Sequence, residues 1–132
     1  DVNIVRGTPP NYAAIVAVFP AATREGVVFT YGDTVYVNGN PEIPPQLKAH
    51  EAVHVNQQRQ FASPDAWWES YLTNLPFRLD QELVAHRAEF RTLKHLNREQ
   101  AAKSLHFIAA RLASPLYGGM IGIAEAKRAI LK

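Results

Sequence analysis

The chain has 132 residues, carries a net charge of +2 and contains no cysteine. This length fits one domain over residues 1–132 that can bury a core without disulfides. The lack of cysteine excludes thiolate metal sites and a thiol nucleophile, so a bound metal would need His, Asp, Glu or water as ligands. No apolar run approaches the roughly 20 residues that span a bilayer, so we expect a soluble protein that does not bind membranes.

The first third of the sequence predicts a short helix and then a β-hairpin or two short strands. An apolar stretch over residues 12–19 is typical of a helix, and Pro20 closes it. Runs of β-branched and aromatic residues at 26–30 and 34–37 flank the turn sequence Tyr31-Gly32-Asp33. The sequence contains no second β-rich region after this hairpin.

From Pro45 the pattern is helical almost to the end of the chain. After the first of these helices, Ser63 and Pro64 form an N-cap and first turn that begin a second one, which residues 74–76 interrupt. Further helices are predicted at residues 77–96, 97–113 and 123–131. We therefore expect an α+β fold, predominantly helical, in which a short hairpin precedes one helix and four further helices.

The pentapeptide His50-Glu51-Ala52-Val53-His54 lies in the helix that follows Pro45. Residues four apart share one face of a helix, roughly 6 Å along its axis, so both imidazoles can reach one metal ion while Glu51 projects beside it. Catalytic zinc normally keeps three protein ligands and one position for water, so a third ligand is needed. We choose Glu82, because it lies on a separate helix that can return antiparallel past the motif.

The sequence resembles the gluzincin branch of the zincin metallopeptidases, and in particular its minimal single-domain members. The HExxH motif and a glutamate in an E-x-x-A setting on a later helix carry this resemblance. More narrowly, the chain resembles a group of uncharacterised phage-encoded proteins. The phrases that carry this second resemblance are Tyr31-Gly32-Asp33-Thr34-Val35-Tyr36, His50-Glu51-Ala52-Val53-His54-Val55-Asn56-Gln57-Gln58, Trp67-Trp68-Glu69-Ser70-Tyr71-Leu72, Phe77-Arg78-Leu79-Asp80-Gln81-Glu82 and Ser114-Pro115-Leu116-Tyr117-Gly118.

The resemblance implies a zincin-like fold and a zinc-dependent peptidase that acts on a peptide or protein. Its zinc ligands would be His50, His54 and Glu82, and Glu51 would be the general base. Zinc in such a site lowers the pKa of bound water toward about 7. The substrate would lie antiparallel to an edge strand formed by Thr34, Val35, Tyr36 and Val37.

Gluzincins often carry an acid four residues after the glutamate ligand, where it accepts a hydrogen bond from the first motif histidine. This chain has His86 at that position. Three interpretations stay open: His86 orients the first histidine, replaces Glu82 as ligand, or packs in the core. The oxyanion donor is equally open, with Tyr71, His106 and Tyr117 as candidates; Tyr117 is favoured because it lies in a loop marked by Pro and Gly.

The sequence is also compatible with two other functions. The first is a zinc-stabilised structural or interaction protein, for instance in a phage particle, although Glu51 has no role in a purely structural site. The second is nucleic-acid binding through Arg87, Arg91, Lys94 and Arg98. Because Glu89 and Glu99 interleave with these residues, a solvated helix face is favoured and no nucleic-acid partner is expected.

Compartment and oligomeric state are less constrained. The chain begins at Asp1 without an initiator Met and without a signal-peptide pattern, which suggests a processed product, a trimmed chain or a renumbered fragment. The second resemblance implies a phage virion or an infected bacterial cell. The sequence predicts no oligomeric state.

Overall fold

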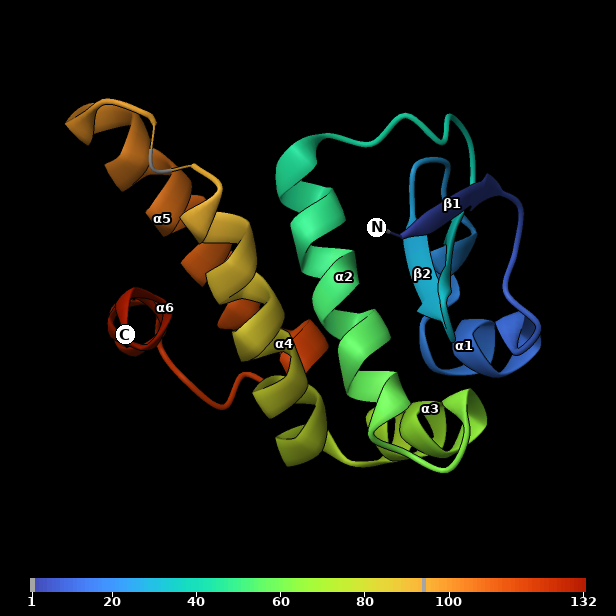
Figure 1. Ribbon diagram of the computed structural model, residues 1–132. Coiled ribbons are helices and arrows are strands. Elements are labelled where there is room, and N and C mark those ends of the chain that lie inside the picture. The colour runs from blue at the N-terminus through green and yellow to red at the C-terminus, as the bar shows by residue number, and fades with distance from the viewer. Residues whose placement is uncertain (1, 94) are drawn as a thin grey trace.

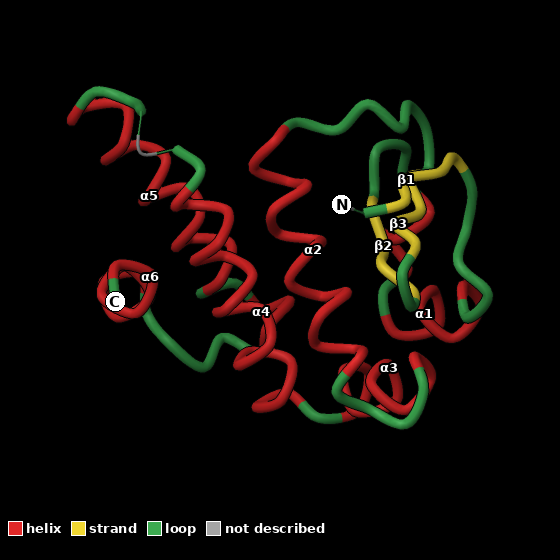
Figure 2. The backbone as a smooth tube through the Cα atoms, viewed as in Figure 1, coloured by secondary structure: helices red, strands yellow, loops and turns green. Residues whose placement is uncertain are grey.

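The structure, a computed structural model, describes residues 2–93 and 95–132 and is α+β, mostly helical over these residues. Helix α2 (Pro45–Arg59) lies between the sheet and helix α4 (Leu75–Arg91), which runs back beside it (Figure 1). Figure 2 shows the strands gathered on one side of α2, and α4 with the helices that follow it on the other. The other elements are α1 (Tyr12–Val18), η1 (Pro20–Thr23), α3 (Pro64–Thr73), α5 (Arg98–Leu112), η2 (Pro115–Tyr117) and α6 (Ile123–Leu131).

The sheet contains a strand that the sequence did not predict. Strand β1 (Asn3–Arg6) pairs in parallel with β3 (Thr34–Val37), and β2 (Val28–Tyr31) pairs with β3 in antiparallel register. The predicted hairpin is confirmed, with Gly32 in its turn at φ +63°. The short β1 was missed because its strand state depends on pairing with residues some thirty positions away.

The order β1-β3-β2 corrects one expectation about the site. Thr34–Val37 is the central strand over the described residues, with partners on both sides, so it offers no free edge to a substrate. The edge next to the pocket described below is β2 instead. Strand β3 is central rather than an edge because β1 pairs with the side of β3 that β2 leaves open.

Helix ends follow their capping residues. The Ser63 side chain accepts a hydrogen bond from Ala66 N, as predicted for the start of α3. Asn74 caps α4, which therefore begins at Leu75 rather than Phe77, and it ends at Arg91 rather than residue 96. Lys94, one of the four basic residues considered for nucleic-acid binding, lies outside the described residues.

Three apolar clusters form the core. One lies between the sheet and α2, one around the aromatic residues of α3, and one among α4, α5 and α6. Trp67, Trp68 and Tyr71 belong to the second and are buried. No helix within residues 2–93 or 95–132 has both the length and the apolar content to cross a membrane.

Candidate metal centre

Two histidines of α2 face α4 at the middle of the molecule. His50 and His54 are one helical turn apart, and their ring centroids lie 5.0 Å apart. Only 7% of His50 and 5% of His54 is exposed. Buried imidazoles on one helix face need polar partners, and α4 supplies them.

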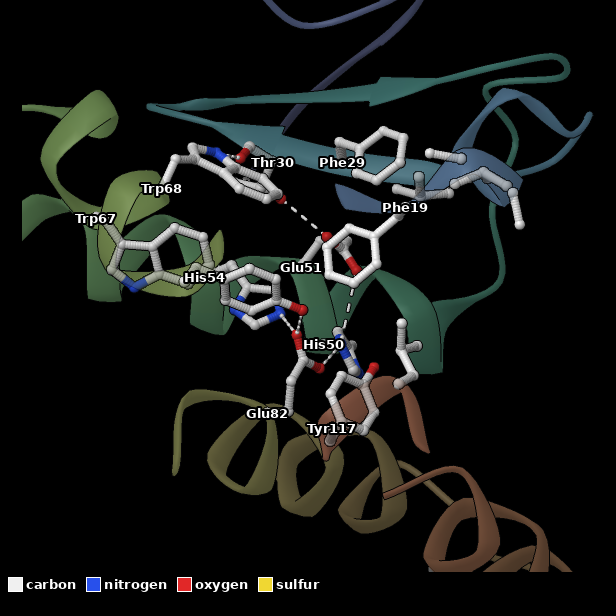
Figure 3. A pocket seen from close by; sticks show the side chains of 16 residues that line it. Phe19, Phe29, Thr30, His50, Glu51, His54, Trp67, Trp68, Glu82 and Tyr117 are labelled. Atoms are coloured by element: carbon white, nitrogen blue, oxygen red, sulfur yellow. Dashed lines mark hydrogen bonds and ion pairs between the residues drawn. The ribbon is translucent and has the colours of Figure 1, made fainter. Parts of the chain in front are cut away.

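Glu82 of α4 reaches both imidazoles, as Figure 3 shows. Its Oε1 lies 3.2 Å from His50 Nε2, and its Oε2 lies 3.1 Å from His54 Nε2. One ligand atom from each of the three residues can be chosen so that all lie within 4.8 Å of one another. The predicted residues therefore meet as a buried group that could bind a metal ion, whose element the arrangement does not identify.

The donor set fits a metal with nitrogen and oxygen ligands. Glu82 Oε1 is buried and makes no hydrogen bond of good geometry, which leaves an acceptor for a cation. The other ring nitrogens of the histidines are already engaged. His50 Nδ1 lies 2.9 Å from Glu89 Oε1, and His54 Nδ1 lies 2.8 Å from Gln57 Oε1. With Nδ1–H donated to these oxygens, both Nε2 lone pairs are directed to the shared site.

Glu89 corrects two sequence-based interpretations. It was expected on a solvated helix face, but it is 7% exposed and also accepts a hydrogen bond from Arg111 Nη2 at 2.6 Å. It also fills the role considered for His86, because it is the acceptor for His50. Seven residues separate Glu89 from Glu82, so two turns of α4 place both carboxylates on the same face.

His86 does not contact His50 through a hydrogen bond. Its Nδ1 lies 2.6 Å from the Glu82 carbonyl oxygen, one turn earlier in α4, and its ring packs against those of His50 and Tyr117. It is 1% exposed, and its Nε2 has no hydrogen-bond partner. Burial lowers the pKa of His86 to about 4, so the ring is neutral near pH 7. Of the three interpretations of His86, the geometry matches the one in which the side chain packs in the core.

The metal-free centre is strongly polarised. Burial alone would lower the pKa of His50, but its contacts with Glu82 and Glu89 outweigh burial and raise that pKa to about 10. Burial opposes ionisation of Glu82 as well, yet the charges of His54 and His50 hold its pKa well below the usual range. A divalent cation bound between these groups would compete with protons for the same imidazole nitrogens.

Glu51 lies beside the three residues without joining them. Its Oε1 accepts a hydrogen bond from the Thr30 hydroxyl at 2.9 Å, and its Oε2 lies 3.8 Å from His50 Nε2. The side chain is buried, and it lines the same pocket as the group (Figure 3). The hydrogen bond from strand β2 therefore fixes the Glu51 carboxylate beside the pocket.

The pocket has a volume of about 300 Å³. The three grouped residues and Glu51 form its polar base, and β2, η1, α3 and η2 form its walls. The hairpin is tied to α2 by Gln58, which donates to Thr30 O at 2.8 Å and accepts from Gly32 N at 2.7 Å. This tie places the β2 edge beside the metal centre.

The three candidate oxyanion donors lie in different places. His106 is exposed on α5 and does not line the pocket, so that prediction is wrong. Tyr71 lines it, but its hydroxyl donates to Glu82 Oε2 at 2.6 Å. Tyr117 lines it from η2. Burial and the nearby Glu82 raise the pKa of both tyrosines well above 10, so both keep the proton that a donor needs.

Sequence reasoning missed Thr30, Gln57, Gln58, Glu89 and Arg111 as contributors to this centre. A helical-spacing signal existed for some of them: Gln58 lies seven residues after Glu51, as Glu89 does after Glu82. No signal marked Thr30 or Arg111, because their contacts join elements distant in the chain.

The chain matches no protein-family model, and comparisons with curated proteins and with solved structures return no match.

Proposed function

We propose that this protein is a zinc-dependent peptidase with a zincin-like fold, in which Glu51 is the general base. The observation that carries the proposal is the position of Glu51: buried, held by Thr30, and facing the pocket beside three metal-competent side chains. A site that only held a structural metal would normally supply four protein ligands and would not open to a pocket.

His50, His54 and Glu82 would hold the ion, with their nitrogen and oxygen donors matching a catalytic zinc site. Zinc, when bound, supplies a lowered pKa of coordinated water and polarisation of a carbonyl. Glu51 would accept a proton from the attacking water and deliver it to the leaving amine. Glu89 and Gln57 would hold the two imidazoles with Nε2 toward the ion.

Tyr117 is our proposed hydrogen-bond donor to the oxyanion, since Tyr71 is engaged with Glu82. Tyr117→Phe should lower kcat roughly a hundredfold and leave KM nearly unchanged, because the donor acts on charge that develops in the transition state. Equal kcat values for the variant and the wild type would remove this role.

The test of the function compares wild type with Glu51→Gln and Glu82→Ala. We expect about one zinc per chain in wild type and in Glu51→Gln, and loss of zinc in Glu82→Ala. Hydrolysis of a peptide mixture should fall by roughly 10² to 10⁴ in Glu51→Gln. Zinc at full occupancy with no cleavage by wild type would favour the structural alternative, and undiminished cleavage by Glu51→Gln would exclude the mechanism.

A further inference from the structure

The walls of the pocket differ sharply from its base. Above the metal centre, the lining consists of aromatic, aliphatic and small side chains, with one threonine whose hydroxyl is engaged with Glu51. Figure 3 shows Trp68 and Phe29 on the strand side of Glu51, Phe19 close to Glu51, and Tyr117 on the opposite side next to His50. The wall residues are Phe19, Ala21, Ala22, Val27, Val28, Phe29, Thr30, Trp67, Trp68, Tyr71, Leu116 and Tyr117.

Among the described lining residues, the acidic and imidazole side chains are Glu51 and the three residues of the metal group. Behind the wall lies Arg78, whose guanidinium carbon is 4.7 Å from the Phe19 ring centroid. Its nitrogens donate to the carbonyl oxygens of Tyr71, Leu72 and Leu116. Arg78 therefore braces η2 and presents no guanidinium to a ligand in the pocket.

The lack of charged side chains on the described walls of the pocket restricts which substrate groups can enter the pocket. Recognition of a free terminal carboxylate uses Arg or Lys, and recognition of a free terminal amine uses an acidic side chain outside the catalytic machinery. The lining offers neither. A charged terminus or side chain in this pocket would lose its hydration without a partner, which is strongly unfavourable.

The backbone beside the pocket suits a continuous peptide. In the β2–β3 ladder, the backbone N–H and C=O groups of successive β2 residues point alternately toward β3 and toward the free edge of the sheet. Asn38 N donates to Val27 O, so Val28 and Thr30 direct their backbone groups to the free edge. Thr30 is 2% exposed, and its carbonyl oxygen accepts from Trp68 Nε1 and Gln58 Nε2, so the backbone groups of the partly buried Val28 are the ones left for a peptide.

We infer that the enzyme is an endopeptidase that cleaves an internal bond next to a large apolar side chain. The inference rests on the proposed peptidase function. A cavity of about 300 Å³ is at the lower end of ligand pockets, so it takes one large side chain and its neighbours rather than an extended ligand. The substrate class is a protein with an exposed or unfolded apolar segment, and not a peptide recognised by its charged terminus.

The first experiment measures binding without turnover. Zinc-loaded Glu51→Gln is titrated with N-acetylated, C-amidated hexapeptides that differ only at one central residue: Phe, Leu, Asp or Lys. Both tryptophans of the chain, Trp67 and Trp68, line the pocket and report binding by fluorescence. We expect the Phe and Leu peptides to bind roughly ten- to a hundredfold more tightly than the Asp and Lys peptides, because one apolar side chain is buried.

A matched pair of variants tests the location. Leu116 lines the pocket and is 48% exposed, whereas Leu131 is 60% exposed at the end of α6 and does not line it. In the Glu51→Gln background, Leu116→Asp should weaken binding of the Phe peptide about tenfold, and Leu131→Asp should leave it unchanged. Both positions are at the surface, so both variants should fold.

The second experiment compares cleavage of the capped Phe peptide by wild type with cleavage of the same sequence with free termini. Internal cleavage of the capped peptide, with no gain from free termini, supports the inference. Zinc-dependent cleavage that requires a free terminus or a charged residue overturns it and leaves the peptidase function intact. Zinc-independent cleavage, or binding of the Phe peptide without cleavage, counts against the proposed function instead. Failure of every capped peptide both to bind and to be cleaved also overturns the inference.

Discussion

Glu89 Oε1 accepts a hydrogen bond from His50 Nδ1 at 2.9 Å, while Arg111 Nη2 contacts the other oxygen of the same carboxylate at 2.6 Å. Three helices thus contribute one chain of contacts, from α5 through α4 to the motif helix α2. Burial opposes the charge of Glu89, but His50 and Arg111 outweigh it and lower the pKa of Glu89 to about 2. The carboxylate is therefore ionised at any pH at which the histidines could bind a metal.

Replacing this carboxylate should weaken the metal site without removing it. Glu89→Gln keeps the shape of the side chain but loses the charge that orients the His50 ring, so we expect zinc affinity to fall roughly ten- to a hundredfold. Competition with a chromophoric chelator measures the affinity. Glu99→Gln, at an exposed position of α5, is the control and should match wild type. Equal affinities for Glu89→Gln and wild type would exclude the positioning role.

Glu82 and His86 should differ in what their loss removes. Glu82→Ala deletes one donor of the metal group and should abolish stoichiometric zinc binding. His86→Ala leaves the three donors in place but opens a cavity where a side chain was 1% exposed, so zinc should remain while the free energy of unfolding falls by roughly 2–4 kcal/mol. Metal analysis and urea unfolding separate the two outcomes. Zinc loss in folded His86→Ala would make His86 a ligand after all.

The metal-free protein should lose stability as pH rises from about 6.5 to 10. The pKa of His50 is raised from 6.5 to about 10 in the folded state, and the pKa of His54 is raised as well. The folded state therefore binds more protons than the unfolded chain in this window. The resulting stabilisation of the folded state is complete below about pH 6.5 and is lost as the pH rises to about 10. Urea unfolding in chelator at several pH values measures the trend.

Zinc should reverse that dependence. Zinc binds the neutral imidazoles, so loading the site releases protons and becomes more favourable as pH rises over the same window. Calorimetric titration with zinc in buffers of different ionisation enthalpy counts the protons released. Zinc uptake without proton release near pH 7.5 would show that the histidines are already neutral in the metal-free protein.

The outer edge of β2 should be needed for peptide binding but not for the fold. Val28 N–H faces away from β3, so Val28→Pro removes a donor to the substrate without breaking the sheet, and we expect zinc to be retained and KM to rise about tenfold. Phe29 faces β3 opposite Tyr36, and Phe29→Pro should disrupt the hairpin. Unchanged KM in folded Val28→Pro would indicate that the peptide does not lie along β2.

Local sequence determined most of the elements and the nucleus of the site. The alternation and turn residues around Gly32 specify the hairpin, and the Ser63 and Asn74 caps specify where α3 and α4 begin. The four-residue spacing of His50 and His54 needs only a helix to bring both rings to one face. Glu82 could be selected because a helix returning beside α2 is the simplest connection after α3.

Only the tertiary structure decided which strand forms the free edge and which groups support the metal ligands. Strand β1 covers β3 through pairing across some thirty residues, and this moved the edge to β2. Glu89, Arg111 and Thr30 acquired their roles through contacts between elements 21 to 39 residues apart. Spacing within one helix is set by its backbone geometry, whereas contacts between elements depend on how complete faces pack, which no local pattern encodes.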